Sequence, residues 1–187
     1  PSYSLYSSSN LEFDTDLFSF VYTSLTTPRS VYDFNMQTKE RTLLKQKQVL
    51  GGEFDIDNYV SERIFATSRD GKTQIPISLV YRKGLQKNGE NPLLLNGYGS
   101  YGNSSDPYFS SVRLSLLDRG FTYAIAHVRG GQEMGRDWYE DGKLLKKKNT
   151  FYDFIDCAKH LIDIKFTSSK HIYATGGSAG GLLMGAV

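Results

Sequence analysis

The sequence predicts an α/β fold in which a sheet with alternating strands and helices follows a group of antiparallel strands. Two observations lead to this class. The first fifty-odd residues contain only short strand-like runs, whereas the residues after Gly51-Gly52 alternate strand-like runs with helical ones. The chain also ends on a strand, a glycine turn and a small-residue helix. Such alternation implies right-handed βαβ units and a mostly parallel sheet.

The N-terminal part has three strand-like runs that are rich in aromatic residues and separated by turn signals. They are Leu17–Thr23, Arg29–Asn35 and Thr42–Lys47. Their spacing is typical of an antiparallel meander such as a β-propeller blade. We expect residues 1–52 to form this part and residues 53–187 to form the α/β part.

The α/β part opens with two strands joined by an Asp-Gly hairpin signal, Ser61–Ser68 and Gln74–Arg82. The later strands are expected at Pro92–Asn96, Phe121–Val128 and His171–Thr175, and the helices at Ser110–Leu117, Thr150–Ile164 and Leu182–Val187. The helix over 150–164 is amphipathic, and its apolar face comprises Phe151, Phe154, Ile155, Ala158, Leu161 and Ile162. Glycine-rich segments follow three of the strands, at 97–102, 129–135 and 176–181. Chemistry in such sheets occurs at the carboxyl ends of the strands, so we expect the site there.

Composition excludes several partners. The 187 residues carry 22 Lys and Arg against 20 Asp and Glu, a balance that does not favour nucleic acid or an anionic membrane. The basic run at 143–148, KLLKKK, is interpreted as a solvated helix face. The single cysteine, Cys157, fits a reducing compartment such as the cytoplasm and is expected to be buried. No histidine pair has metal-ligand spacing, so we expect no metal and no cofactor. Because the chain starts on Pro1 and stops within a helix, we expect a piece of a longer protein.

The segment Gly176-Gly177-Ser178-Ala179-Gly180 matches G-x-S-x-G between a strand and a helix, the pattern of a nucleophile elbow. The strained serine backbone requires small residues two positions before and after it, which explains Gly176 and Gly180. Ser178 is therefore the candidate nucleophile, and the N–H of Ala179 is a candidate oxyanion donor. An ordinary serine in a glycine turn is the alternative.

The segment 97–102, GYGSYG, matches the dinucleotide-binding pattern G-x-G-x-x-G. Two features argue against a nucleotide. Residues 103–107 are turn-like, so no helix starts at once, and Tyr98 and Tyr101 would crowd a pyrophosphate. In a serine hydrolase this loop would border the oxyanion hole, where the Tyr98 phenol could donate a hydrogen bond. A packing role for Tyr98 remains open from these residues alone.

The chain has three histidines, and all of them precede Ser178. In α/β-hydrolases the triad order is serine, then acid, then histidine, so none is placed in sequence to act as its base. We interpret His127, His160 and His171 as structural residues.

Taken together, these motifs resemble the prolyl oligopeptidase family of serine peptidases, and most closely its oligopeptidase B branch. The matching segments are GYGSYG at 97–102, SLLDRG at 115–120, AHVRGG at 126–131, WYEDGKLL at 138–145, residues 149–151 and GGSAGG at 176–181. The resemblance implies a β-propeller that caps an α/β-hydrolase domain. The chain would comprise the last propeller strands followed by the N-terminal portion of the hydrolase domain.

By matching position, the resemblance makes Ser178 the nucleophile and assigns the oxyanion hole to the Ala179 N–H and the Tyr98 hydroxyl. It implies cleavage of short peptides after Arg or Lys, with Asp106 binding a second basic side chain. Two departures are Tyr108, where the family has a second acidic residue, and Gln132, where it commonly has glycine. We expect weaker dibasic preference from the first and a stiffer loop from the second.

The family's catalytic Asp and His would lie beyond Val187, so we expect the isolated chain to be inactive. The alternatives are a prolyl- or acylaminoacyl-specific peptidase of the same family and a non-catalytic binding protein with a degenerate hydrolase domain. The sequence does not indicate an oligomeric state.

Overall fold

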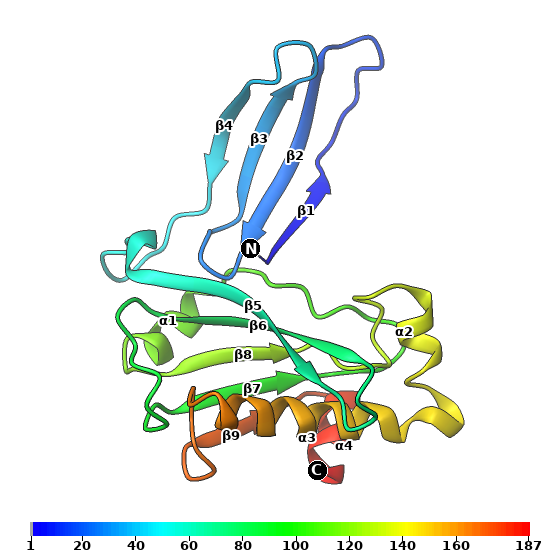
Figure 1. Cartoon of the computed structure of the whole chain (residues 1–187). Helices are drawn as coiled ribbons and strands as arrows, with labels where there is room; N and C mark the ends of the chain where they lie inside the picture. The colour runs from blue at the N-terminus through cyan, green and yellow to red at the C-terminus, as the bar shows by residue number, and fades with distance from the viewer. Residues whose placement is uncertain (1) are drawn as a thin grey trace.

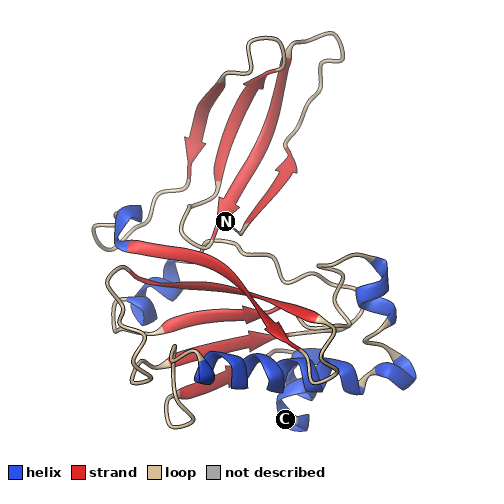
Figure 2. Cartoon of the chain, in the orientation of Figure 1, coloured by secondary structure: helices blue, strands red, loops and turns tan. Residues whose placement is uncertain are grey.

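The computed structural model describes residues 2–187, which form two sheets placed one above the other, as Figures 1 and 2 show. The first is a four-stranded antiparallel meander. Its strands, in sheet order, are β1 (Tyr3–Ser7), β2 (Leu17–Ser24), β3 (Ser30–Asn35) and β4 (Arg41–Gln46). The three predicted runs are confirmed to within one residue at either end, and the meander is confirmed with them. β1 was not predicted, because its sequence, YSLYS, lacks a buried alternating face.

Cross-strand aromatic pairs hold this sheet together. The Tyr3 and Tyr22 rings stack with centroids 5.6 Å apart, and Phe20 and Tyr32 stack at 5.4 Å. Such pairs contribute roughly 0.5–1.5 kcal/mol each beyond their burial. The aromatic richness of the first fifty residues therefore serves one face of the meander.

The second sheet has five strands in the order β5-β6-β8-β7-β9. They are β5 (Tyr59–Thr67), β6 (Gln74–Arg82), β7 (Leu93–Gly97), β8 (Thr122–Ala126) and β9 (Ile172–Thr175), preceded by the 3₁₀ turn η1 (Ile56–Asn58). β7 pairs parallel with β8 and β9, whereas β6 pairs antiparallel with β5 and β8. The expectation of a mostly parallel sheet is therefore wrong, because two of its four pairings are antiparallel. Parallel neighbours need a crossover connection, usually a helix, and no helix lies between β6 and β7. β7 therefore runs in the direction opposite to β6.

The β5–β6 hairpin turns at the predicted Asp-Gly pair. Asp70 Oδ1 accepts hydrogen bonds from the N–H groups of Lys72 and Thr73 at 2.8 and 2.9 Å, and Gly71 has φ of 72°. These backbone hydrogen bonds lower the pKa of Asp70 from 3.8 to about 2. The charged Asp70 therefore stabilises the turn.

The helices are α1 (Ser111–Leu117), α2 (Arg136–Glu140), α3 (Lys148–Asp163) and α4 (Ala179–Ala186), with a 3₁₀ turn η2 (Leu144–Lys146) before α3. Sequence analysis missed the short α2 and η2. α3 packs on β5, β6 and β8 and contacts α4, whereas α1 packs on β6 and β8 (Figure 1). Ile77 and Leu79 of β6 join the core cluster beneath α3, and Val80 joins Leu117 of α1. Because neighbouring strand residues face opposite ways, α3 and α1 cover opposite faces of the sheet.

The buried face of α3 differs in part from the predicted one. Phe154 and Leu161 are buried as expected, and Cys157 is fully buried beside them. Ile155 and Ile162, however, are only partly buried, and their expected places in the core are taken by polar residues. Those buried polar residues are Thr150, Asp153 and Asp156. The two carboxylates are buried because each pairs with an arginine of another segment.

The two sheets touch through the end of β2. Leu25 packs with Val80, Leu117 and Ile125 of the second sheet and its helix. The Phe109 N–H also donates to Thr23 Oγ1 at 3.2 Å. Within residues 2–187, no helix combines the length and the apolar character needed to cross a bilayer.

Candidate active site

Ser178 stands in the turn between β9 and α4. Its φ of 55° and ψ of −119° are strained for a residue with a side chain, and it is exposed. Strain of this kind costs on the order of 1–3 kcal/mol and concentrates at functional sites. The predicted strand, turn and helix are confirmed, although α4 begins at Ala179 rather than at Leu182. Because Ala179 is the first helical residue, its N–H has no partner within the helix.

The glycines around Ser178 are required by close backbone contacts. A Cβ atom on Gly176 would lie 2.6 Å from the Gly180 carbonyl oxygen and 2.8 Å from that of Gly97. A Cβ on Gly180 would lie 2.6 Å from the same Gly97 oxygen. Gly177, by contrast, has open space around it. The predicted need for small residues at positions 176 and 180 is confirmed, and the contacts join the Ser178 turn directly to the end of β7.

The three glycine-rich loops follow β7, β8 and β9, whose parallel alignment brings their carboxyl ends to one edge. A pocket of about 480 Å³ opens there. Tyr98 and Asp106 line it together with Gly177, the residue before Ser178. The structure therefore brings together the loop that carries Tyr98, the predicted binding residue Asp106 and the serine turn. Ala179 lines a second pocket, of about 570 Å³, which shares no lining residue with the first.

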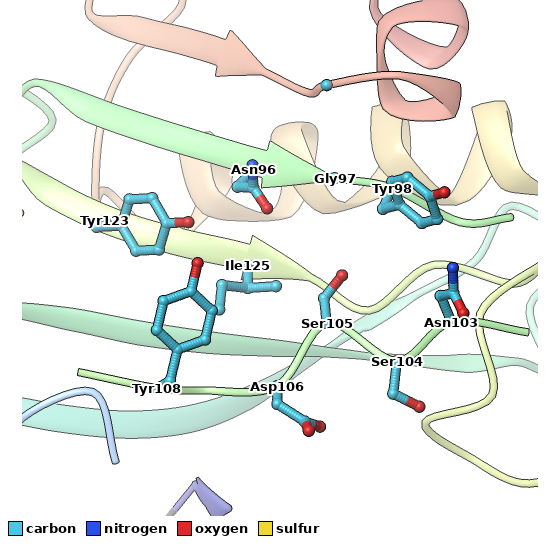
Figure 3. A pocket seen from close by; sticks show the side chains of 11 residues that line it. Asn96, Gly97, Tyr98, Asn103, Ser104, Ser105, Asp106, Tyr108, Tyr123 and Ile125 are labelled. Carbon is cyan, nitrogen blue, oxygen red and sulfur yellow. The ribbon is translucent and has the colours of Figure 1, made fainter. Parts of the chain in front are cut away.

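Figure 3 shows the walls of the first pocket. Asn96 and Tyr98 come from the end of β7, and residues 103–108 form the opposite wall. The Asp106 carboxylate is exposed and turned to the side opposite the Ser105 hydroxyl. The Tyr108 hydroxyl points toward that of Tyr123. Two phenols and the Ser105 hydroxyl thus face this part of the pocket, whereas the Asp106 carboxylate lies on the outer side of the same wall.

The backbone of Tyr108 is held by Arg113, a residue that sequence analysis did not single out. The Arg113 side chain is 8% exposed, and its Nη1 donates to the Tyr108 carbonyl at 2.9 Å. Its guanidinium lies 4.0 Å from the centre of the Tyr123 ring, a cation–π distance. Burial raises the pKa of Tyr123 and lowers that of Arg113. The loop wall is therefore held by a buried cation rather than by a flexible surface contact.

The loop after β7 does not have the form of a dinucleotide site. Residues 98–110 contain no helix, and α1 begins only at Ser111. A pyrophosphate would therefore find no helix N-terminus at this loop. Within residues 2–187 there is also no cluster of three or more side chains suited to hold a metal ion.

The loop after β8 is anchored by the buried pair of Arg129 and Asp153, which sequence analysis missed. Asp153 is fully buried, and its carboxylate accepts from Arg129 Nη2 at 2.6 Å, from Nε at 2.8 Å and from the backbone N–H at 3.0 Å. These hydrogen bonds raise the pKa of Arg129. In the sequence, Arg129 stands out only as an arginine directly before Gly130-Gly131. Nothing in the sequence indicates that Asp153 is its partner.

His127 lies in the core, as expected for a structural histidine. Its side chain is 2% exposed, and Nε2 lies 2.7 Å from Ser78 Oγ. Nδ1 lies 3.6 Å from Glu133, whose Oε1 accepts from the Ser105 N–H at 2.8 Å. Glu133 thus ties the loop after β8 to the pocket wall. The Gln132 side chain is exposed next to Gly102, and the stiffening expected of it stays a prediction.

The basic run at 143–148 is not a uniform solvated helix face, so that interpretation is corrected. Leu144 and Leu145 are exposed and Lys146 pairs with Asp141 at the surface. Lys147, however, is half-buried and donates to the Gly99 carbonyl at 2.5 Å. The run is divided between η2 and the start of α3, and Lys147 lies between these two elements with its side chain turned toward the loop after β7.

Comparisons with known proteins agree with this architecture. Residues 107–187 match the family model described as the prolyl oligopeptidase family. The chain is 54% identical over 186 residues to dipeptidyl aminopeptidase BI of Pseudoxanthomonas mexicana, covering 100% of this chain and 25% of that protein. It is 38% identical over 173 residues to a prolyl endopeptidase of Elizabethkingia meningoseptica, covering 92% of this chain and 24% of that protein.

Among solved structures, oligopeptidase B from Leishmania major superposes with a TM-score of 0.89 at 47% identity, covering 99% of this chain and 26% of that one. The chain spans about a quarter of the length of these relatives. Its fold is that of the N-terminal part of an α/β-hydrolase domain preceded by antiparallel strands of a β-propeller blade. With this fold, the family match at 107–187 and similarity along its whole length, the chain belongs to the prolyl oligopeptidase family.

Proposed function

We propose that this chain carries the nucleophile of a serine peptidase that cleaves short peptides after arginine or lysine. The observation that carries the proposal is the strained, exposed Ser178 at the junction of β9 and α4, beside a pocket lined by Tyr98. A residue held at φ of 55° with two flanking glycines packed on the Gly97 carbonyl is a costly arrangement. An α/β-hydrolase uses such an arrangement to expose its nucleophile.

The chemistry would proceed in two steps. The Ser178 Oγ bonds to the carbonyl carbon of the scissile peptide, its proton passes through a base to the leaving amine, and the C–N bond breaks. Water then attacks the acyl-serine ester and releases the acid. The oxyanion of each tetrahedral intermediate would accept hydrogen bonds from the Ala179 N–H and the Tyr98 hydroxyl.

The base would come from outside this chain. His127 is buried against Ser78, and His171 precedes β9 at the end opposite Ser178. From the resemblance, we expect the catalytic histidine and aspartate after Val187. Activity should therefore be measured on the full-length protein.

Specificity for a basic residue is supported by Asp106, an exposed acidic residue on the wall of the pocket beside Tyr98. An exposed carboxylate can bind a guanidinium through charge-assisted hydrogen bonds. Tyr108 offers a phenol rather than a second negative charge, so we propose a modest preference for a second basic residue. Asp106→Asn should lower kcat/KM for Arg-Arg relative to Gly-Arg substrates by about two- to fivefold.

The similarity to dipeptidyl aminopeptidase BI favours a second candidate, removal of dipeptides from the amino terminus. The similarity to a prolyl endopeptidase favours a third, cleavage after proline. Fluorogenic Arg-Arg, Gly-Arg and Gly-Pro substrates, each with a free and with an acetylated amino terminus, separate the three. Preference for Arg in both forms supports the first, a strict need for the free amine the second, and preference for proline the third.

The decisive experiment compares wild type with Ser178→Ala, using the exposed Ser169 in the loop before β9 as the control, Ser169→Ala. A fluorophosphonate should label wild type and Ser169→Ala once, at Ser178, and leave Ser178→Ala unlabelled. Labelling elsewhere, or turnover by Ser178→Ala, would disprove the assignment. A folded protein that neither labels nor turns over any substrate would support a binding protein instead.

We also propose that the domain boundary lies near residue 52, between residues 1–52 and 53–187. The segment from β4 to η1 is largely exposed and belongs to neither sheet. Limited trypsin digestion of the folded protein should therefore cut first near Lys47, and initial cuts inside β5 or β6 would contradict this boundary.

A further inference from the structure

Lys147 makes three contacts that no other lysine of the basic run makes. Its ammonium donates to the Gly99 carbonyl at 2.5 Å, to Ser100 Oγ at 2.8 Å and to Thr150 Oγ1 at 3.2 Å. An ammonium has three donors, so all of them are used. Two of the acceptors belong to the residues that directly follow Tyr98.

This placement is electrostatically unfavourable for Lys147. It is half-buried, and burial lowers its pKa. It immediately precedes α3, where the helix dipole disfavours a positive charge. In the part of the chain that the structure describes, no carboxylate lies within ion-pair distance of Lys147, whereas the neighbouring Lys146 pairs with Asp141. The half-buried charge of Lys147 is therefore compensated by its hydrogen bonds, two of which tie it to the residues that follow Tyr98.

Apart from its hydrogen bonds with Lys147, the loop after β7 is held by close packing. Gly99 has φ of 66°, and a Cβ there would collide with Thr150 and Val128. Thr150 Oγ1 lies 2.6 Å from the Arg129 carbonyl and donates to it, which leaves a lone pair for Lys147. The loop after β7, the loop after β8 and the start of α3 therefore meet at this one point.

Tyr98 lies between two glycines that are each immobilised from outside the loop. The Gly97 carbonyl lies against Gly176 and Gly180 of the serine turn. The Gly99 carbonyl is held by Lys147. Glycine backbones are otherwise free to adopt many conformations, so these two anchors determine where the Tyr98 phenol is presented. Of the two, only the Lys147 anchor is a side chain that can be changed without altering the glycines.

We propose that Lys147 is a positioning residue that fixes the Gly99 carbonyl and thereby holds the Tyr98 hydroxyl at the oxyanion. This role rests on the proposed serine peptidase function and deepens it. Lys147 itself does not touch the substrate; it acts through the loop. Removing the ammonium should leave substrate binding intact and weaken the hydrogen bond that the transition state receives from Tyr98.

The test uses the full-length protein with Lys147→Met, Lys147→Arg and the matched surface control Lys146→Met. We expect Lys147→Met to lower kcat roughly 10- to 100-fold, as a displaced catalytic group does. KM should stay within about twofold, because the loss is confined to the transition state. Lys147→Arg, which keeps a cationic donor, should recover part of kcat, and Lys146→Met should match wild type. A change confined to KM, or an equal loss in Lys146→Met, would overturn the proposal.

A double-mutant cycle distinguishes positioning from general destabilisation. If Lys147 acts through Tyr98, Lys147→Met should cost almost nothing further in kcat when Tyr98 is already phenylalanine. Full additivity of Lys147→Met and Tyr98→Phe would overturn the proposal, and so would a Tyr98→Phe variant with wild-type kcat. If Lys147→Met does not fold, the same cycle is run with Lys147→Arg, whose effect must again vanish in the Tyr98→Phe background. Fluorophosphonate labelling of Ser178 tests the peptidase assignment separately, so failure of that assignment is recognised by absent labelling.

Discussion

The contact between the serine turn and the end of β7 makes a sharp prediction about Gly176 and Gly177. These glycines are adjacent, yet a Cβ on Gly176 meets two backbone oxygens, at 2.6 and 2.8 Å, whereas a Cβ on Gly177 meets nothing within 4 Å. Gly177 also has no positive φ that would exclude a side chain. Gly176→Ala and Gly177→Ala therefore add the same methyl group to two very different surroundings.

The geometry sets the size of the difference. Real Cβ atoms essentially never lie closer than 3.0 Å to another heavy atom. The new Cβ of Gly176→Ala would lie 2.6 Å from the Gly180 carbonyl oxygen, so this oxygen must move away. Both oxygens belong to backbone, which cannot rotate away as a side chain does. Overpacking of this kind costs about 1–3 kcal/mol. Gly177→Ala restricts the unfolded chain and should be neutral or stabilising by up to about 1 kcal/mol.

Urea unfolding of the full-length variants, followed by far-ultraviolet circular dichroism, measures the difference. We expect a lower midpoint for Gly176→Ala and an unchanged or higher midpoint for Gly177→Ala. Gly176→Ala should also react more slowly with a fluorophosphonate, since the Gly97 carbonyl and the neighbouring Tyr98 are displaced. Equal midpoints for the two variants would refute the argument that close contact with Gly97 and Gly180 imposes glycine at position 176.

Three further predictions concern the oxyanion donor, the buried ion pair and the hairpin turn. Tyr98→Phe should lower kcat about 10²- to 10³-fold with little change in KM, and an effect on KM alone would indicate a substrate contact instead. Asp153→Asn should destabilise the fold by about 3–5 kcal/mol in urea unfolding, because it leaves the buried Arg129 guanidinium uncompensated; a loss below about 1 kcal/mol would contradict the pairing. The pKa of Asp70 is lowered to about 2, so its ionised form stabilises the fold above pH about 4, and this contribution is lost as the pH falls toward 2. The stability advantage of wild type over Asp70→Asn, measured as a difference in urea midpoint, should therefore shrink between pH 5 and pH 3, and a constant difference would argue against a charged Asp70 in the turn.

The elements that sequence analysis located well are those with local signals. β6 occupies Gln74–Arg82, as predicted, because the Asp-Gly turn determines where the strand begins. The serine turn was predicted because its strained backbone and close contacts require glycine at positions 176 and 180, which produces a recognisable local pattern. Three strands of the first sheet were predicted from their strand-like runs, whereas β1 was not predicted and is evident only from its pairing with β2 in the structure.

The supports of the candidate site depend on distant partners and could not be predicted. Lys147 is one of three consecutive lysines, and what singles it out is a carbonyl 48 residues earlier in the chain. Asp153 occupies a position on α3 that appeared polar, and its burial follows from Arg129, which arrives from the end of β8. Pairings of this kind are set by how loops meet at a sheet edge, which local periodicity does not encode.

By itself, the sequence determined the α/β class, the order of the longer strands and helices and the presence of a serine on a glycine turn, because these depend on hydrophobic periodicity and backbone sterics within a few residues. The tertiary structure alone decided that β6 runs antiparallel to its neighbours and that Tyr98 and Asp106 line one pocket with the serine turn. It also decided that a half-buried lysine, Lys147, holds the loop between them. The physical reason is that side chains dozens of residues apart acquire their burial, charge partners and orientation only when the sheet assembles.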